Sequence, residues 1–258
     1  MKGTKFIGAC CQIGQRKIGV DSAPMYISKY MPKLNIELIT DFKESSYLEL
    51  YRTHNKYIKD NKVITIGGDH SISGATVASS LDTFGGELNV VWVDAHADIH
   101  TFASSETKNT HGMPLGSLMG HDKHYNIPLL KESQLTYIGL RDVDPYEQGV
   151  IADSDIAVYD MDYIKNKSIR NVIEHLNKIT GPIHLSFDVD SIDPVEFSST
   201  GTPVENGLTM TDVWTILDTI KDKTVSCDFV EFNPYLSNHL DAKRDTVTLS
   251  NMISHMSK

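Results

Sequence analysis

Three short apolar runs of this chain each lead into a group of aspartate and histidine residues, and this pattern constrains the fold more than any other feature. The groups are His70 after the run at 63–66, Asp94, His96 and Asp98 after the run at 90–93, and Asp188 and Asp190 after the run at 183–187. Runs that are apolar throughout are typical of strands covered on both faces of a parallel sheet. Since the carboxyl ends of such strands form one edge of the sheet, we expect these polar side chains to meet there.

Apolar runs alternate with helical patterns along the sequence. The candidate strands cover residues 5–9, 63–66, 90–93, 135–138, 156–159, 183–187 and 225–229. Ile169, Val172 and Leu176 recur at the spacing of one helix face, and a last helix is expected over 241–255. The alternation predicts an α/β fold, a three-layer αβα sandwich with a central, mostly parallel sheet. At this length we expect a single domain, 1–258.

The composition limits the kinds of partner. The chain has 258 residues and a formal net charge of −10. A nucleic-acid partner requires a basic face and is not expected, whereas an acidic chain suits a cation site and a cationic substrate. A solubilising acidic surface would give the same charge. No apolar run approaches the roughly 20 residues of a membrane helix, and the first residues show no signal-peptide pattern, so no membrane contact and a cytoplasmic location are expected.

The three cysteines do not form a recognisable disulfide or zinc pattern. Cys10 and Cys11 are neighbours and Cys227 is far away, so the number is odd. We interpret all three as reduced core residues, as is usual in the cytosol.

Aspartate and histidine residues at alternate positions are suited to binding metal ions. Alternate side chains of an extended segment point the same way, so Asp94, His96 and Asp98 can converge, as can Asp188 and Asp190. Clustered carboxylates would take up protons unless cations compensated their charge. Together with His70 these ligands exceed what one ion needs, so two ions fit better. Oxygen and imidazole ligands favour manganese, with cobalt, iron, nickel or zinc as alternatives, and two such ions activate a shared water.

Each motif also has a simpler interpretation. A lone histidine such as His70 is often a hydrogen-bonded structural residue, and an isolated Asp-x-Asp is usually a solvated loop. The three motifs together favour a metal site.

The motifs resemble the three metal motifs of the ureohydrolase family, which includes arginases, agmatinases and formimidoylglutamases. They read GGDHS at 67–71, DAHAD at 94–98 and SFDVDSIDP at 186–194, and the similarity extends from Ile18 to Pro234. The resemblance implies two Mn²⁺ ions per chain. Their ligands would be His70, Asp94, Asp98 and Asp188 for one ion and Asp94, His96, Asp188 and Asp190 for the other, with Asp94 and Asp188 shared.

The resemblance also implies catalytic residues. Glu231 would pair with a substrate guanidinium, a planar cation that matches a carboxylate; a structural ion pair is the alternative. His111 would move protons to and from solvent, unless it is a loop histidine near the pocket mouth. Asp98 would accept a hydrogen bond from a metal-bridging hydroxide, and Thr202 would lie near the guanidinium.

Two segments resemble arginases more than their relatives. Asp144 would recognise the substrate α-amino group directly and Glu147 would do so through water. The loop residues expected to bind the α-carboxylate are Ser105, Thr107 and Asn109. His100 stands where arginases usually carry an asparagine that contacts this carboxylate. Its imidazole can still donate a hydrogen bond, or it marks another guanidino substrate.

The resemblance therefore implies a binuclear manganese hydrolase that cleaves the guanidinium group of L-arginine to L-ornithine and urea by a metal-bridging hydroxide. One alternative is an agmatinase or other guanidino-acid ureohydrolase, in which the α-carboxylate loop would be idle. Another is a catalytically silent relative that binds a partner protein, which the complete ligand set disfavours. The family usually forms trimers or hexamers, so a homotrimer or homohexamer is expected.

Overall fold

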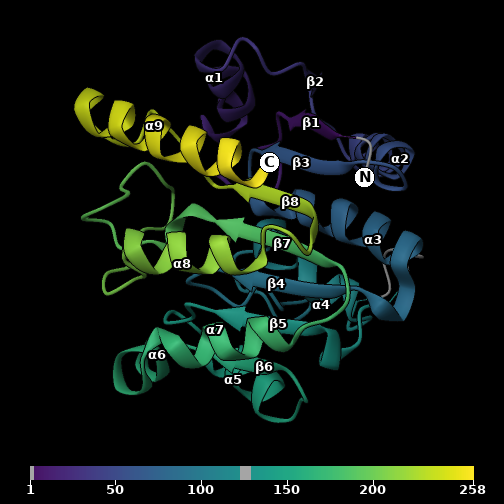
Figure 1. Cartoon of the computed structure of the whole chain (residues 1–258), viewed down its shortest axis with the longest axis vertical. Helices are drawn as coiled ribbons and strands as arrows, with labels where there is room; N and C mark the ends of the chain where they lie inside the picture. The colour runs from purple at the N-terminus through teal and green to yellow at the C-terminus, as the bar shows by residue number, and fades with distance from the viewer. Residues whose placement is uncertain (1–2, 123–128) are drawn as a thin grey trace.

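An eight-stranded sheet lies at the centre of the computed structural model, which describes residues 3–122 and 129–258 (Figure 1). Every neighbouring pair of strands in these residues is parallel, in the order β2-β1-β3-β8-β7-β4-β5-β6. The strands are β1 (Thr4–Ala9), β2 (Ile36–Ile39), β3 (Lys62–Gly67), β4 (Asn89–Val93), β5 (Leu135–Ile138), β6 (Ala157–Tyr159), β7 (Ile183–Asp188) and β8 (Thr224–Val230).

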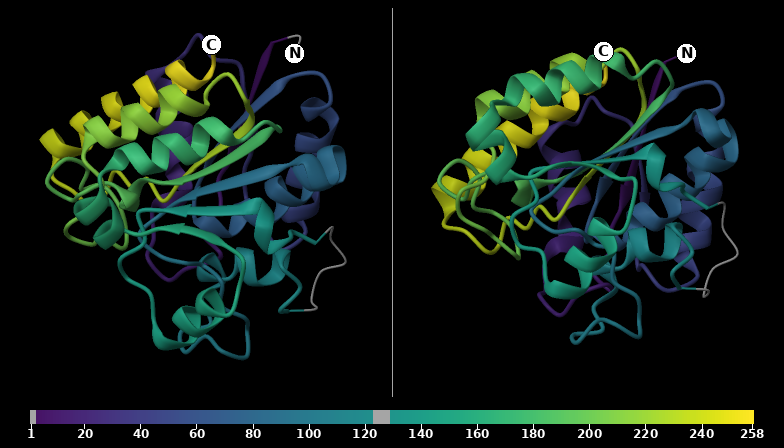
Figure 2. Two further views of the ribbon diagram at one scale, coloured as in Figure 1. Left: turned by 60° about the horizontal axis from the view of Figure 1, so that its bottom comes forward. Right: turned by 90° about the horizontal axis from the view of Figure 1, so that it is seen from below.

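Helices cover both faces of this sheet. They are α1 (Ala23–Tyr30), α2 (Ser46–Ile58), α3 (Ser73–Phe84), α4 (Pro114–Leu118), α5 (Pro145–Ala152), α6 (Met161–Lys167), α7 (Ile169–Lys178), α8 (Met210–Ile220) and α9 (His239–Met256). Figure 2 shows α7, α8 and α9 along one face and α2 and α3 along the other. The α/β three-layer architecture predicted from the sequence is therefore confirmed.

The structure adds one strand that the sequence patterns did not predict. β2 is an edge strand in which Leu38 is 39% exposed. Because an edge strand is not covered on both faces, its sequence is not continuously apolar and does not stand out. The last helix also begins slightly earlier than expected, at His239, because the Asn238 side chain accepts hydrogen bonds from the backbone of Leu240 and Asp241.

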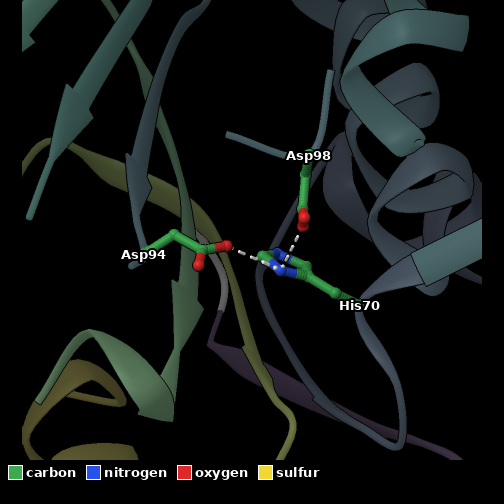
Figure 3. A group of neighbouring side chains, drawn as sticks. All are labelled: His70, Asp94 and Asp98. Atoms are coloured by element: carbon green, nitrogen blue, oxygen red, sulfur yellow. Dashed lines mark ion pairs between the residues drawn. The ribbon is translucent and has the colours of Figure 1, made fainter. Parts of the chain in front are cut away.

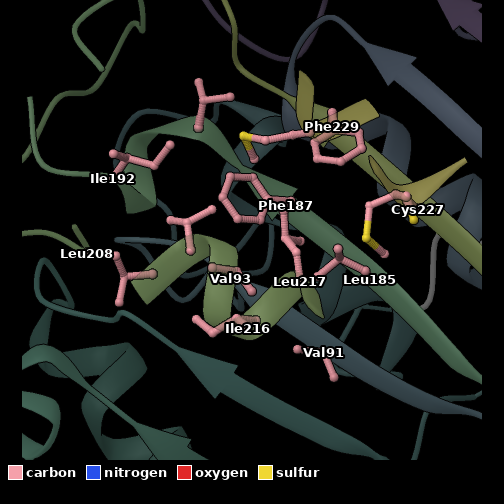
Figure 4. Packing of buried hydrophobic residues seen from close by; sticks show 14 of the residues in the cluster. Val91, Val93, Leu185, Phe187, Ile192, Leu208, Ile216, Leu217, Cys227 and Phe229 are labelled. Atoms are coloured by element: carbon pink, nitrogen blue, oxygen red, sulfur yellow. The ribbon is translucent and has the colours of Figure 1, made fainter. Parts of the chain in front are cut away.

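The face of the sheet beneath α7, α8 and α9 forms an apolar core. Leu185 and Phe187 of β7 point to this face and pack with Phe229 of β8 and with Leu217 of α8 (Figure 4). The other face packs against α2, α3 and α4 through a second apolar cluster. The three cysteines are buried and unpaired in the described chain, and among the helices described none has the length and apolar character needed to cross a bilayer.

Four central strands end side by side at the site. β3, β8, β7 and β4 are consecutive neighbours in the sheet, so the segments that follow them share one edge. This edge brings together residues that are far apart in sequence, as parallel sheets do at the carboxyl ends of their strands.

Candidate metal centre

The segment after β3 is shaped by Gly68 and Asp69. A Cβ atom on Gly68 would collide with the carbonyl oxygen of Cys11, so only glycine allows this approach. The Asp69 carboxylate accepts hydrogen bonds from the backbone of Ser71 at 3.1 Å and of Gly14 at 2.8 Å. This turn places His70 at the carboxyl edge of the sheet, nearly fully buried.

The first ligand group gathers around the Nδ1 atom of His70 (Figure 3). This atom lies 3.0 Å from Asp94 Oδ2, 2.9 Å from Asp98 Oδ2 and 3.2 Å from Asp188 Oδ2. All four side chains are buried. They come from the segments after β3 and β4 and from the end of β7, so the order of the strands brings them to one edge of the sheet.

The second ligand group shares Asp94 with the first. His96 Nδ1 lies 3.1 Å from Asp190 Oδ2 and 3.4 Å from Asp94 Oδ1. Asp190 also accepts a hydrogen bond from Thr202 Oγ1 at 2.7 Å. The six predicted metal ligands therefore lie in two adjoining groups joined through Asp94.

The chemistry of these groups fits divalent cations. His70 Nδ1 is buried against three carboxylates but has no hydrogen-bond partner in acceptable geometry among the described residues, while its Nε2 atom lies 2.8 Å from Ser186 Oγ. An unpaired ring nitrogen that faces carboxylate oxygens is unfavourable unless a cation or a proton lies between them. Oxygen and imidazole donors without thiolate match manganese and its neighbours in the first transition row.

The pKa values show the same need for positive charge. Burial raises the pKa of Asp188 well above its usual value, and the nearby Asp190 and Asp94 raise it further. Burial and Asp94 likewise raise the pKa of Asp98, to about 6. For His70 burial acts in the opposite direction, but Asp188, Asp94 and Asp98 outweigh it and raise the imidazole pKa. Without metal ions the cluster thus holds protons, which divalent cations would replace.

Trp92 contacts two members of the first ligand group, Asp94 and His70. Its Nε1 atom donates a hydrogen bond to Asp94 Oδ2 at 3.0 Å, and its ring stacks on His70 with centroids 4.3 Å apart. Trp92 precedes Asp94 by two residues on the same strand face, so the period of two was the signal that could have identified it.

Two predicted catalytic residues have a strained backbone. Asp98 has φ 51° and Glu231 has φ 64°, the left-handed region that costs a non-glycine residue about 1–2 kcal/mol. Such outliers concentrate at functional sites, where the surrounding structure imposes them.

Glu231 lies between the metal ligands and the predicted proton-transfer histidine. Its Oε1 atom accepts hydrogen bonds from the backbone of His70 at 2.9 Å and from His111 Nδ1 at 3.0 Å. Gln15 Nε2 donates to Oε2 at 2.7 Å, a contact that no sequence pattern indicated. Burial lowers the pKa of His111, but Glu231 outweighs burial and raises it to about 9; His111 in turn keeps the pKa of the buried Glu231 below its usual value.

The predicted α-amino end of the pocket forms a separate polar cluster. His100 Nε2 lies 2.9 Å from Asp144 Oδ2, and the imidazole stacks on Tyr146 with centroids 5.2 Å apart. Glu147 Oε1 is 3.9 Å from the same nitrogen. Burial, and then Asp98, raise the pKa of Glu147 to about 7. His100 is therefore engaged by the residue expected to recognise the α-amino group.

In the predicted α-carboxylate loop, the Ser105 and Thr107 side chains make their hydrogen bonds within the loop. Ser105 Oγ lies 3.4 Å from Thr107 Oγ1, which accepts from the backbone of Asn109 at 3.2 Å. No hydrogen bond joins Ser105, Thr107 or Asn109 to the two ligand groups within the described chain.

Comparisons with known proteins identify the family of this chain. The profile described as "Arginase family" matches residues 2–255, and the chain belongs to this family. It is 41% identical to the arginase of Eremothecium gossypii over 190 residues, 68% of this chain and 47% of that protein. It is 40% identical to the arginase of Neurospora crassa over 205 residues, 72% of this chain and 57% of that protein. The chain thus matches about half the length of these curated relatives.

A solved structure is similar over nearly the whole chain. The arginase of Entamoeba histolytica, in complex with L-ornithine, superposes with a TM-score of 0.89 at 30% identity and covers 97% of each chain. The two proteins therefore share the same fold over nearly their whole length.

Proposed function

We propose that this protein is a binuclear, metal-dependent arginase that hydrolyses L-arginine to L-ornithine and urea. The observation that carries the proposal is the continuous site formed by two ligand groups, joined through Asp94, and a carboxylate, Glu231, hydrogen-bonded to the backbone of His70. A cation-binding carboxylate beside two metal positions suits hydrolysis of a guanidinium group. The names of the relatives, and the L-ornithine bound to the Entamoeba arginase, support this substrate class.

The chain offers a complete ligand set for two ions. His70, Asp94, Asp98 and Asp188 would hold one, and Asp94, His96, Asp188 and Asp190 would hold the other. Bound divalent ions would supply an activated water and positive charge near the reacting carbon. Manganese is our proposal because the donors are oxygen and imidazole alone.

Glu231 would orient the substrate. A carboxylate that accepts two N–H groups of a guanidinium holds that plane in a fixed position. Gln15 holds one oxygen of Glu231, while His111 and the His70 backbone hold the other. The carboxylate is thus oriented before substrate arrives, which lowers the entropy cost of placing the guanidinium carbon near the attacking water.

Asp98 and His111 would move the protons. The Asp98 carboxylate, buried in the first ligand group, would accept a proton from the attacking water and deliver it to the departing amine nitrogen. His111 is part-buried at the edge of the site and would transfer protons between the site and solvent. Asp144 and Glu147 would bind the α-amino group, and His100 with Ser105, Thr107 and Asn109 would bind the α-carboxylate.

The alternative substrate is a guanidino compound without an α-carboxylate, such as agmatine. The specific observation in its favour is that Ser105 Oγ lies 3.4 Å from Thr107 Oγ1, so these hydroxyls, expected to bind the α-carboxylate, contact each other. L-arginine would offer its α-carboxylate to His100 and its α-amino group to Asp144, whereas agmatine keeps the amine but has no carboxylate for His100.

Urea release from L-arginine and agmatine by the manganese-loaded protein tests the proposal. We expect a strong preference for L-arginine. The matched control is Glu231→Gln, which keeps the shape of the side chain and should bind metal as the wild type does while losing most turnover. Preference for agmatine would replace the substrate assignment, and the absence of urea from both would overturn the proposed function. The cytoplasmic location, the single domain and the trimeric or hexameric assembly stay predictions.

A further inference from the structure

A buried polar layer continues from the metal centre into the protein, between the sheet and α3. On β7 and β8 the residues that face α3 include His184, Ser186 and Asp228, all fully buried. α3 contributes Ser73 and Thr76, also fully buried. Buried polar groups are costly unless each is hydrogen-bonded, so the partners of each group define what the layer does.

A continuous hydrogen-bond chain links His70 to Asp228. His70 Nε2 lies 2.8 Å from Ser186 Oγ. Ser186 Oγ lies 3.0 Å from Ser73 Oγ, which donates to Asp228 Oδ2 at 2.9 Å. The chain therefore begins at a candidate metal ligand and ends at a carboxylate within the core.

The carboxylate fixes the direction of every bond in this chain. An ionised carboxylate can only accept hydrogen bonds, so the Ser73 hydroxyl must donate its one proton to Asp228. Toward Ser186, Ser73 can then only accept a hydrogen bond. Ser186 then has no proton left for His70, so it accepts from Nε2. In the neutral imidazole, the form that would bind an ion, the proton is thereby held on Nε2 and the Nδ1 lone pair is left for the metal.

One oxygen of Asp228, Oδ2, accepts the hydrogen bonds that hold it as an anion, while the buried Oδ1 atom has no hydrogen-bond partner among the described residues. Its Oδ2 atom also accepts from His184 Nε2 at 3.0 Å and from Thr76 Oγ1. Burial would raise the pKa of Asp228, but His184 and the donated hydrogen bonds outweigh burial and keep the pKa below its usual value. The acceptor at the end of the chain is thus stable in one protonation state.

We propose that Ser73 and Asp228 are positioning residues for the metal centre: they fix the tautomer and ring orientation of His70 through Ser186. This inference rests on the proposed function, since it assigns His70 as a ligand of one of the two ions. Partners of a ligating histidine typically change metal affinity about 10–100-fold when removed. Here the group that sets the tautomer is Asp228 on β8, which is three hydrogen bonds away from His70 Nε2.

Ser73→Ala and Thr76→Ala form a matched pair that isolates the chain. Each change removes one hydroxyl that donates to Asp228 Oδ2 from the same buried helix face, but only Ser73 connects to Ser186. Mn²⁺ affinity and stoichiometry would be measured by chelator competition, together with urea unfolding of the metal-free proteins. We expect Ser73→Ala to weaken one of the two ions about 10–100-fold and leave the other unchanged. Thr76→Ala should bind both ions as the wild type does.

The outcomes separate this inference from the proposed function. Equal Mn²⁺ affinities in Ser73→Ala and Thr76→Ala would overturn the positioning role, while two ions bound by the wild type would leave the proposed function standing. Equal weakening of both ions by Ser73→Ala would also overturn it, because a general structural defect does not select the ion at His70. A wild-type protein that binds no Mn²⁺ would refute both proposals.

A double-mutant cycle adds a second, independent test. Asp228→Asn should weaken the same ion as Ser73→Ala, because an amide no longer dictates the direction of the chain. The double variant should lose no more affinity than the weaker-binding single variant, since both changes interrupt one chain. Additive losses would show that the two residues act separately and would contradict the proposal.

Discussion

The two faces of β7 differ in chemistry although both are buried. Ile183, Leu185 and Phe187 point to the apolar core beneath α8, whereas His184, Ser186 and Asp188 point toward α3 and the metal centre. None of the six residues is more than 3% exposed. Burial therefore does not distinguish the faces, but the need for partners does: apolar side chains need only close packing, while each buried polar atom needs a specific hydrogen bond.

This difference shows how one strand serves stability and function at once. Successive side chains of a strand point to opposite faces, so adjacent residues can have unrelated tasks. The apolar face stabilises the fold by removing hydrocarbon from water. The polar face orients ligands and is expected to contribute little net stability, because its hydrogen bonds replace equivalent ones to water.

The largest expected effect is loss of activity on the polar face. Asp188→Ala removes a shared ligand of the two ions. Loss of the several kcal/mol by which the ions stabilise the transition state should lower turnover about a thousandfold or more. Because the pKa of Asp188 is raised in the folded protein, the stability of the metal-free fold should fall as the pH rises above the ordinary pKa of an aspartate, and this fall should be smaller in Asp188→Ala. Metal content, urea release and urea unfolding would be measured together. Full activity with two bound ions would refute the ligand assignment.

The second effect is loss of stability on the apolar face. Leu185→Ala leaves a cavity in the core and should lower the free energy of unfolding by about 2–5 kcal/mol. Since Leu185 faces away from the metal centre, Mn²⁺ affinity and activity of the folded protein at low temperature should be unchanged. Urea unfolding and metal titration of the same sample would test both parts. A parallel loss of Mn²⁺ affinity would show that the two faces are coupled.

The apolar face and the ligand groups follow from local patterns. Continuously apolar runs predicted the central strands, and the carboxyl ends of those strands predicted where the candidate ligands would meet. The extended backbone expected for the ligand segments was wrong, because Asp98 has φ 51° and Asp190 lies in the 3-10 helix Val189–Ser191. The edge strand β2 did not follow, because its partial exposure removes the pattern. The strained backbone of Asp98 and Glu231 could not be predicted either, since no local pattern marks either position and even aspartate adopts a positive φ only occasionally.

The polar layer could not be predicted because it depends on tertiary contacts. Ser73, Thr76 and Ser80 of α3 resemble a solvent-exposed helix face in the sequence, yet they point into the protein. Their partners Ser186 and Asp228 are more than 100 residues away. The pairing of His100 with Asp144 is likewise set by the fold, across 44 residues.

The smallest expected effect is a pH dependence within the polar layer, at His54. This histidine is fully buried, and its two ring nitrogens lie 2.9 Å from Ser79 Oγ and 2.8 Å from Ser226 Oγ. Burial, and then the neighbouring His184, lower its pKa to about 3. In the unfolded chain His54 takes up a proton near pH 6.5. The contribution of this histidine to the free energy of unfolding is therefore fully present above about pH 6.5 and is lost as the pH falls toward 3.

From pH 7 to pH 5 this single group should lower the free energy of unfolding by about 2 kcal/mol. His54→Gln can still donate and accept a hydrogen bond but does not titrate, so its loss over the same interval should be smaller by that amount. The comparison requires metal-free protein, because acid also releases ions from carboxylate and imidazole ligands. Equal losses in the two proteins would show that His54 takes up a proton in the folded state. The polar layer would then accommodate a buried charge at His54. Its hydrogen-bond partners would not be fixed there, and the contrast drawn with the apolar face of the sheet would fail at this residue.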